Sequence, residues 1–201
     1  LIATAYIAGM FTDIMEIDAA QYASMARNLL EQDNPLMFFD RGEAYLDKPP
    51  LIFWLTAISF KLFGIHNFTY RLPSLLFSVL AIWSVYGLGK LYYKEKTAFV
   101  AAMITASCQA FFVMNQDVKT DMYLIGSVTF ALWQLAAFIQ TEKWKHLILG
   151  FVGVGLGLLS KGPLGLVLPG LAIGLHLLLT RNWKMLFNWK WLVGLPVAAI
   201  L

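Results

Sequence analysis

The sequence of 201 residues has a single cysteine, Cys108, and very little charge. One cysteine excludes an internal disulfide, so packing must hold the fold together. Charged residues make up 13% of the chain, about half the ~25% of a soluble domain. The sequence also lacks a Gly-rich phosphate loop, a zinc-binding Cys/His spacing and a Ser/His/Asp arrangement. This composition excludes a disordered chain, a disulfide scaffold and an ordinary cytosolic enzyme.

Long apolar runs dominate the chain. Hydrophobic residues make up 59% of it, and the mean hydropathy is +0.67. Because several runs approach the ~20 residues that cross a bilayer, we expect an integral membrane protein. A net charge of +3 in so apolar a chain favours bilayer anchoring over nucleic-acid binding. The sequence starts without Met inside the run 1–11 and stops inside the run 192–201, so we expect a fragment of a longer chain.

The expected fold class is all-α, a polytopic transmembrane helical bundle. Apolar segments predict spans over 70–90, 97–114, 121–140, 146–160 and 163–180, with a further segment over 185–201. Short polar separators are typical of antiparallel neighbours in a bundle. No Asn-Gly hairpin signal or alternating strand is present, which argues against a barrel.

Basic residues divide the separators into two sides. One set holds Lys90, Lys94, Lys96, Lys143, Lys145, Arg181, Lys184 and Lys190. The alternate separators hold only Lys119 and Lys161. The positive-inside rule places the first set in the cytoplasm. Residues 13–48, 115–121 and 160–163 should then share the extracytoplasmic side.

Residues 13–65 form a large first extracytoplasmic loop in this topology. Eight of the twelve acidic residues lie between Asp13 and Asp47. Residues 17–32 predict a helix with one apolar stripe. Residues 49–64 are apolar and aromatic but short, which suits a helix along the membrane interface. Two interfacial helices would therefore hold a polar loop at the lipid boundary.

Three charged side chains on this side are candidates for chemistry, and each also has an ordinary structural interpretation. Asp18 could form a capping box with Gln21 at a helix start. Asp121 could stabilise the first turn of a span. Lys161 could reach from a helix end to the headgroups. Acids close to a bilayer are costly unless paired or solvated, so together they indicate function.

A fourth candidate is the segment Asp47-Lys48-Pro49-Pro50. Proline forces Lys48 out of the helical region, and Pro50 suits the start of the next helix. The result is a stiff strut that fixes Asp47 and Lys48. A reaction on a lipid-linked phosphate needs a base, cations for the phosphate and a membrane entry route. This side of the chain supplies carboxylates, lysines and apolar walls.

Four segments resemble the membrane glycosyltransferases of the GT-C type. They are MEIDAAQYASMARNLLE, YLDKPPLIFWLTAISFKLFG, RLPSLL and LLSKGPLGLVLPGL. The most similar group contains the dolichyl-phosphate-mannose–protein mannosyltransferases and the bacterial aminoarabinose transferase of lipid A. The resemblance covers nearly the whole sequence, which implies that residues 1–201 are the N-terminal transmembrane catalytic domain of such an enzyme.

The resemblance also implies site residues. The family's first motif, Asp-Glu-Ala-Arg-Tyr, reads Asp18-Ala19-Ala20-Gln21-Tyr22 here, without the Glu and the Arg. Asp18 matches the family's first-loop acid and Asp121 its second-loop acid. Substrate-binding positions are matched by Tyr22, Tyr45, Lys48 and Lys161. Asp47 stands where aminoarabinose transferases carry a metal-binding Glu, which implies a divalent metal whose other ligands lie outside this sequence.

The implied reaction moves a sugar from a polyprenyl or dolichyl phosphate to an acceptor on the extracytoplasmic face, with inversion. Asp18 would activate the acceptor, with Asp121 orienting it. Lys48 and Lys161 would hold the carrier phosphate as point charges. The acceptor could be a protein hydroxyl, a lipid A phosphate or a cell-wall glycan, and the partners include the bilayer but no nucleic acid. The implied location is the bacterial inner membrane, with the active site facing the periplasm or exterior.

Two other classes of protein stay open. Breaks at 153–157 and 162–163 could make discontinuous helices, as in transporters of lipid-linked or small solutes. Transporters place polar groups near the membrane midplane, however, and these spans have almost none there. A non-catalytic assembly subunit would not need the acids, so replacing them should leave its activity intact.

Overall fold

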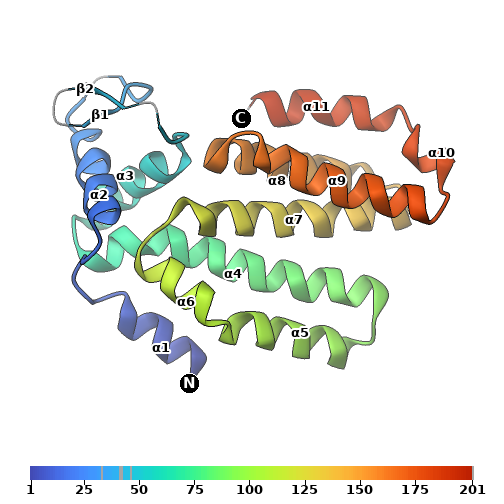
Figure 1. Ribbon diagram of the computed structural model, residues 1–201, viewed down its shortest axis with the longest axis horizontal. Helices are drawn as coiled ribbons and strands as arrows, with labels where there is room; N and C mark the ends of the chain where they lie inside the picture. The colour runs from blue at the N-terminus through green and yellow to red at the C-terminus, as the bar shows by residue number, and fades with distance from the viewer. Residues whose placement is uncertain (33, 41–42, 46, 201) are drawn as a thin grey trace.

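The computed structural model describes residues 1–32, 34–40, 43–45 and 47–200, with the side chain of Asp40 left out. These residues form eleven helices and one short hairpin (Figure 1). The first loop and its flanks contain α1 (Ile2–Gly9), α2 (Ile17–Asn28), β1 (Phe39–Asp40), β2 (Glu43–Ala44) and α3 (Leu51–Phe63). The bundle follows with α4 (Asn67–Tyr92), α5 (Glu95–Ser107), α6 (Gln109–Gln116), α7 (Thr120–Thr141), α8 (Trp144–Lys161), α9 (Leu164–Leu179), α10 (Trp183–Leu186) and α11 (Lys190–Ile200).

Helices α4, α7 and α8 form the middle of the bundle, with α4 and α7 parallel to each other and α8 antiparallel to both (Figure 1). Helix α5 packs on α4 at one side, and α9 and α11 pack on α8 at the other. Helices α4 and α7 are long and apolar enough to cross a membrane, and the bent pair α5–α6 passes the same test together. The chain is therefore an all-α integral membrane protein, as the sequence predicts.

The helices follow the apolar segments of the sequence, with three differences. The segment 97–114 is two helices bent by 48°, because Cys108 has an extended backbone. The segment 185–201 divides into α10 and α11. The hairpin of β1 and β2 was not predicted, since strands of two residues are too short to show an alternating pattern.

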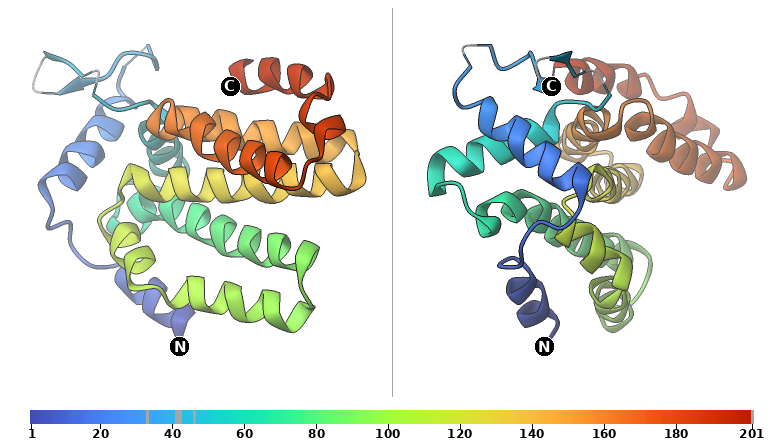
Figure 2. Two further views of the ribbon diagram at one scale, coloured as in Figure 1. Left: turned by 45° about the vertical axis from the view of Figure 1, so that its right-hand side comes forward. Right: turned by 60° about the vertical axis from the view of Figure 1, so that its left-hand side comes forward.

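Helices α2 and α3 pack on the end of the bundle as part of its core (Figure 2). Phe53 of α3, Tyr70 of α4 and Tyr123 of α7 are fully buried there. A second apolar cluster joins α7 and α8 to the last three helices, around Phe138 and Leu177. Buried apolar contacts thus fix the first loop to the bundle. Separating the two would expose apolar surface to water and lower the free energy of unfolding.

Glycines let α8 and α9 approach closely just before and after their connecting turn. A Cβ on Gly157 would lie 2.8 Å from the Cα of Gly165. Such contacts between small residues are a common way for membrane helices to pack. Gly162 in the turn has φ +61°, a left-handed conformation that favours glycine. Lys161 therefore ends a helix whose position is set by backbone contact.

This geometry removes the sequence argument for discontinuous helices. Residues 153–157 lie inside the continuous helix α8. Gly162-Pro163 is the turn between α8 and α9, two separate antiparallel helices. Neither position is a break within one span, which was the transporter feature that the sequence suggested.

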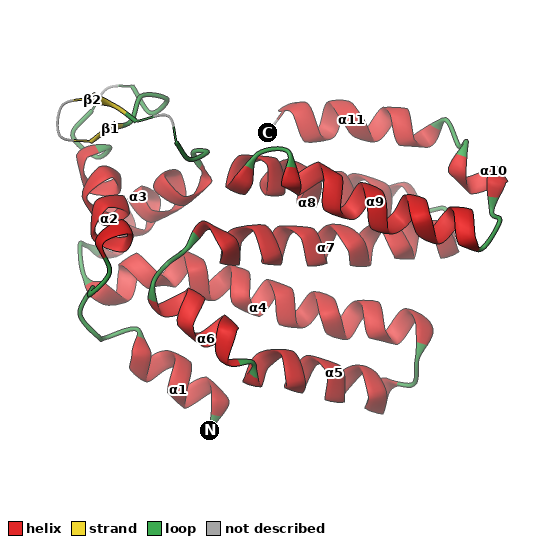
Figure 3. Cartoon of the chain, in the orientation of Figure 1, coloured by secondary structure: helices red, strands yellow, loops and turns green. Residues whose placement is uncertain are grey.

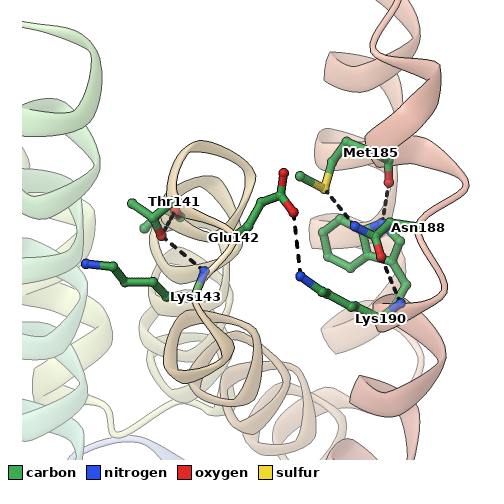
Figure 4. Close-up of polar contacts among 8 residues, drawn as sticks. Thr141, Glu142, Lys143, Met185, Asn188 and Lys190 are labelled. Atoms are coloured by element: carbon green, nitrogen blue, oxygen red, sulfur yellow. Dashed lines mark hydrogen bonds and ion pairs between the residues drawn. The ribbon is translucent and has the colours of Figure 1, made fainter.

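The far end of the bundle has its own polar contacts (Figure 4). Glu142, in the turn after α7, pairs with Lys190 at the start of α11 at 3.5 Å. The Lys190 ammonium also lies 5.6 Å from the centre of the Trp144 ring, a cation–π contact. These contacts fix α11 against the α7–α8 turn, at the opposite end from the candidate site.

Candidate functional site

The predicted site residues lie at one end of the bundle. The first loop with α2, the α6–α7 connection and the α8–α9 turn all occur at the left end in Figure 3. The loops that carry the eight counted basic residues occur at the other end. The grouping of loops into two sides is therefore as the alternation of separators predicts.

Asp18 is an exposed residue at the second position of α2. The helix begins at Ile17, and its N-cap residue is Glu16. The interpretation of Asp18 as the cap of this helix is therefore wrong. Its carboxylate lies in the first turn, where the helix dipole stabilises negative charge, and it faces solvent rather than the helix end.

Asp121 and Lys161 form a direct ion pair. The Lys161 Nζ lies 2.6 Å from the Asp121 Oδ1, and the side chains are 32% and 36% exposed. Asp121 is the second residue of α7, and Lys161 is the last residue of α8. Lys161 thus points to a carboxylate rather than away to headgroups. The pair is partly open to solvent, so a ligand can reach both groups.

Tyr22 and Tyr45 meet beside Asp18. The Tyr22 ring is buried and packs edge-on against Phe53 at 5.7 Å, and the Tyr45 ring packs on the same Phe53 at 6.0 Å. Burial is the main cause that raises the pKa of Tyr22. The charges of Tyr45 and Asp18 and a hydrogen bond with Tyr45 raise it further, in that order of size. The Tyr22 hydroxyl therefore stays protonated throughout the physiological pH range.

Asp47 and Lys48 lie in the segment between β2 and α3. Asp47 is exposed and Lys48 is half-buried. Pro50 is the N-cap residue of α3, as the strut interpretation predicts. Among the described residues neither side chain has a hydrogen-bond or ion-pair partner, so the structure does not join them to Asp121 and Lys161.

The described residues give Asp47 no companion ligands for a metal ion. Among the described residues, no group of three His, Cys, Asp or Glu side chains is close enough to hold a metal ion. One exposed carboxylate is too few ligands for a divalent cation. The expected divalent metal therefore stays a prediction that depends on ligands outside this sequence.

The structure adds an ion pair that the sequence did not single out. Glu16 and Lys119 lie 3.1 Å apart between Oε1 and Nζ. Each stands two residues before a candidate acid, in Glu16-Ile17-Asp18 and Lys119-Thr120-Asp121. The sequence did contain a signal for this pair, because two residues of opposite charge to each other stand two positions before the two acids at helix starts.

Arg71 of α4 is a second addition, although its motif RLPSLL carried part of the family resemblance. Its side chain is 2% exposed. The guanidinium donates to the carbonyl oxygens of Gln116 at 2.9 Å, Thr12 at 2.7 Å and Asp13 at 3.3 Å. Five fixed donors let one arginine bind several carbonyls at once. Arg71 thus ties both acid-bearing segments to the bundle.

Comparisons with known proteins agree with this fold. The family model for dolichyl-phosphate-mannose-protein mannosyltransferase matches residues 47–201, which include Asp121 and Lys161. An undecaprenyl phosphate-alpha-4-amino-4-deoxy-L-arabinose arabinosyl transferase from Wigglesworthia glossinidia brevipalpis is 25% identical over 85% of this chain. Its counterpart from Yersinia enterocolitica is 29% identical over 78% of the chain. The chain spans 31% and 29% of the lengths of these two relatives.

Solved structures show the same fold. The crystal structure of ArnT from Cupriavidus metallidurans in the apo state superposes with a TM-score of 0.90, at 20% identity. It covers 98% of this chain, which corresponds to 38% of ArnT. The structure of the same protein bound to undecaprenyl phosphate gives a TM-score of 0.89.

Proposed function

The chain belongs to the dolichyl-phosphate-mannose-protein mannosyltransferase family, and on this premise we propose that the whole protein is a glycosyltransferase. It moves a sugar from a polyprenyl-phosphate carrier to an acceptor on the extracytoplasmic face. The observation that carries the proposal is the Asp121–Lys161 pair at the same end of an apolar bundle as the exposed Asp18. The named activity of the relatives from Wigglesworthia and Yersinia supports an undecaprenyl-type carrier.

The reaction is a single displacement. The acceptor oxygen forms a bond to the anomeric carbon while the bond from that carbon to the carrier phosphate oxygen breaks. The acceptor proton passes to the Asp18 carboxylate, which acts as the general base. The phosphate leaves with an added negative charge, which nearby ammonium groups stabilise. One displacement inverts the anomeric configuration.

Lys161 serves two anions in this proposal. An ammonium has three donors, and one of them reaches Asp121 at 2.6 Å. The other two can bind the carrier phosphate. Asp121 in turn holds Lys161 in place and orients the acceptor. Lys48, on the proline strut, supplies the second phosphate contact once the donor brings it towards the pair.

Tyr22 and Tyr45 are substrate-binding residues in the proposal. The burial that raises the pKa of Tyr22 keeps a neutral hydroxyl beside Asp18. Such a hydroxyl can donate to a sugar oxygen or accept from a sugar hydroxyl. Its position one helical turn after Asp18 suits a substrate held next to the base.

We place residues 1–201 as the N-terminal transmembrane catalytic part of the protein, in the bacterial inner membrane. The split of basic residues between separators supports a periplasmic or exterior active face. A lipid, glycan or protein acceptor is consistent with a site at the lipid boundary. The choice among these acceptors is expected to depend on the rest of the protein.

Replacing Asp18 tests the proposal directly. Asp18→Asn keeps the size of the side chain but removes the base, so transfer in membranes supplied with undecaprenyl-phosphate sugar should fall by about 10²–10⁴-fold. Glu31→Gln is the matched control, because Glu31 is another exposed acid of the same loop. Transfer by Asp18→Asn at the rate of the control variant would contradict the assigned role of Asp18.

A further inference from the structure

The two helices that carry the candidate acids begin with residues of opposite charge. Glu16 is the N-cap residue of α2, and Lys119 is the N-cap residue of α7. Their charged atoms lie 3.1 Å apart. Asp18 and Asp121 each occupy the second position of the helix that follows. The ion pair therefore joins two helix starts only two residues away from each acid.

We infer that Glu16 and Lys119 are positioning residues, which form a clamp that sets the placement of Asp18 relative to Asp121 and Lys161. The inference rests on the proposed function, in which these groups act on one substrate. Neither Glu16 nor Lys119 caps its own helix through its side chain. The two side chains instead form an ion pair with each other between the two segments.

The electrostatics around Lys119 agree with this arrangement. The hydrogen bond and charge of Glu16 raise the pKa of Lys119, and the charges of Asp117 and Asp18 raise it further by smaller amounts, while desolvation opposes them. The ammonium is therefore charged at neutral pH. The charge of Asp18 acts in the same direction, so the clamp lies within electrostatic reach of the proposed base.

Helix α4 binds the same two segments through side chains of its own. Arg71 binds the carbonyls of Thr12 and Gln116, which lead into α2 and α7. The neighbouring Tyr70 hydroxyl donates to the carbonyl of Ala19, in the first turn of α2, at 2.7 Å. Val118, just before Lys119, is buried with φ +49°, a costly conformation for a β-branched residue. The surrounding contacts thus hold the α6–α7 connection in one strained shape.

A role limited to stability predicts small effects. The Glu16 and Lys119 side chains are 34% and 40% exposed, and ion pairs of this kind contribute little to stability. A shift of about 1 Å in a reacting group, by contrast, can lower a rate about 100-fold. A clamp and a merely stabilising ion pair therefore differ in the size of their effect on turnover.

Charge removal and charge exchange separate these roles. Glu16→Gln and Lys119→Gln each break the pair, and the double variant Glu16→Lys/Lys119→Glu restores it in reverse. The exchange also leaves one charge of each sign at the two helix starts, so the summed dipole effects nearly cancel. The control is Glu95→Gln, which breaks the exposed Lys90–Glu95 pair at the far end.

We expect each single variant to lower kcat for transfer by about 10–100-fold with little change in the donor KM. The exchange should recover most of kcat, and Glu95→Gln should match wild type. Wild-type turnover in both single variants would overturn the clamp. A raised donor KM in Lys119→Gln without recovery in the exchange would also overturn it, because Lys119 would then contact the donor.

A distance measurement makes the test independent of transfer. Nitroxide labels at the exposed positions Ser24 of α2 and Val113 of α6, in a Cys108→Ala background, report the spacing of the two segments. The distance distribution should broaden in the single variants and narrow again in the exchange. Unchanged distributions contradict the clamp even if the proposed reaction is correct. Failure of Asp18→Asn to lose activity contradicts the reaction while these distances still decide the clamp.

Discussion

A methyl group on Gly157 should disturb catalysis without touching any charged residue. The added Cβ would lie 2.8 Å from the Cα of Gly165, whereas carbon atoms prefer about 3.5–4.0 Å. Helices α8 and α9 would have to separate by about 0.7 Å or more, since a backbone atom cannot rotate away. Gly157 lies one turn before Lys161, so this separation moves the Lys161–Asp121 pair.

The expected cost has two parts. Overpacking should destabilise the fold by about 1–3 kcal/mol. The displaced Lys161 should lower transfer by about 10–100-fold, because rates respond steeply to misplacement of about 1 Å. Thermal unfolding in detergent and transfer assays in membranes measure the two parts separately.

Gly170→Ala is the matched control on α9. A Cβ there has no heavy atom within 4 Å, and alanine is the better helix former. Gly170→Ala should therefore keep its stability and its activity. Wild-type unfolding and wild-type transfer in Gly157→Ala would refute the view that close α8–α9 contact fixes Lys161.

Three further predictions concern the phosphate site, the buried arginine and the topology. In titrations with the donor, Lys161→Gln should lower transfer by about 10²–10³-fold, and Lys161→Arg should recover only part of this loss. Equal activity in both variants would mean that Lys161 only anchors α8. Arg71→Lys should lower the free energy of unfolding by about 1.5–3 kcal/mol, since an ammonium cannot reproduce every bond of the buried guanidinium; an unchanged denaturation midpoint would count against its bridging role. In a Cys108→Ala background, cysteine at the exposed position Asn34 should react with an impermeant thiol reagent on intact cells, and cysteine at Lys96 or Arg181 should not; the reverse pattern would invert the membrane orientation.

The spans α4 and α7 were predictable because bilayer thickness fixes their length. Residues 121–140 were expected to span, and α7 covers Thr120–Thr141. The bend at Cys108 was not predictable from hydropathy, since its polar neighbours Ser107 and Gln109 lie inside an otherwise mostly apolar run. The hairpin of β1 and β2 was too short for any periodicity.

The pairing of site residues was harder to predict than their side of the bundle. Asp121 and Lys161 are 40 residues apart, and their contact depends on how α7 and α8 pack. Asp18 was predicted as a candidate, but its alternative role as a cap was wrong because the N-cap residue of α2 is Glu16, two residues earlier. The Glu16–Lys119 pair needed the three-dimensional proximity of two helix starts, which single-sequence patterns do not contain.

The central claim is that this protein transfers a sugar from a polyprenyl-phosphate carrier through Asp18. Its most direct test is mass analysis of products from membranes that express the protein and receive isotope-labelled sugars on undecaprenyl phosphate. We predict a labelled acceptor and an equal amount of free undecaprenyl phosphate in wild type, with neither product in Asp18→Asn. Release of the carrier without a labelled acceptor, or equal labelling in both proteins, would contradict the account.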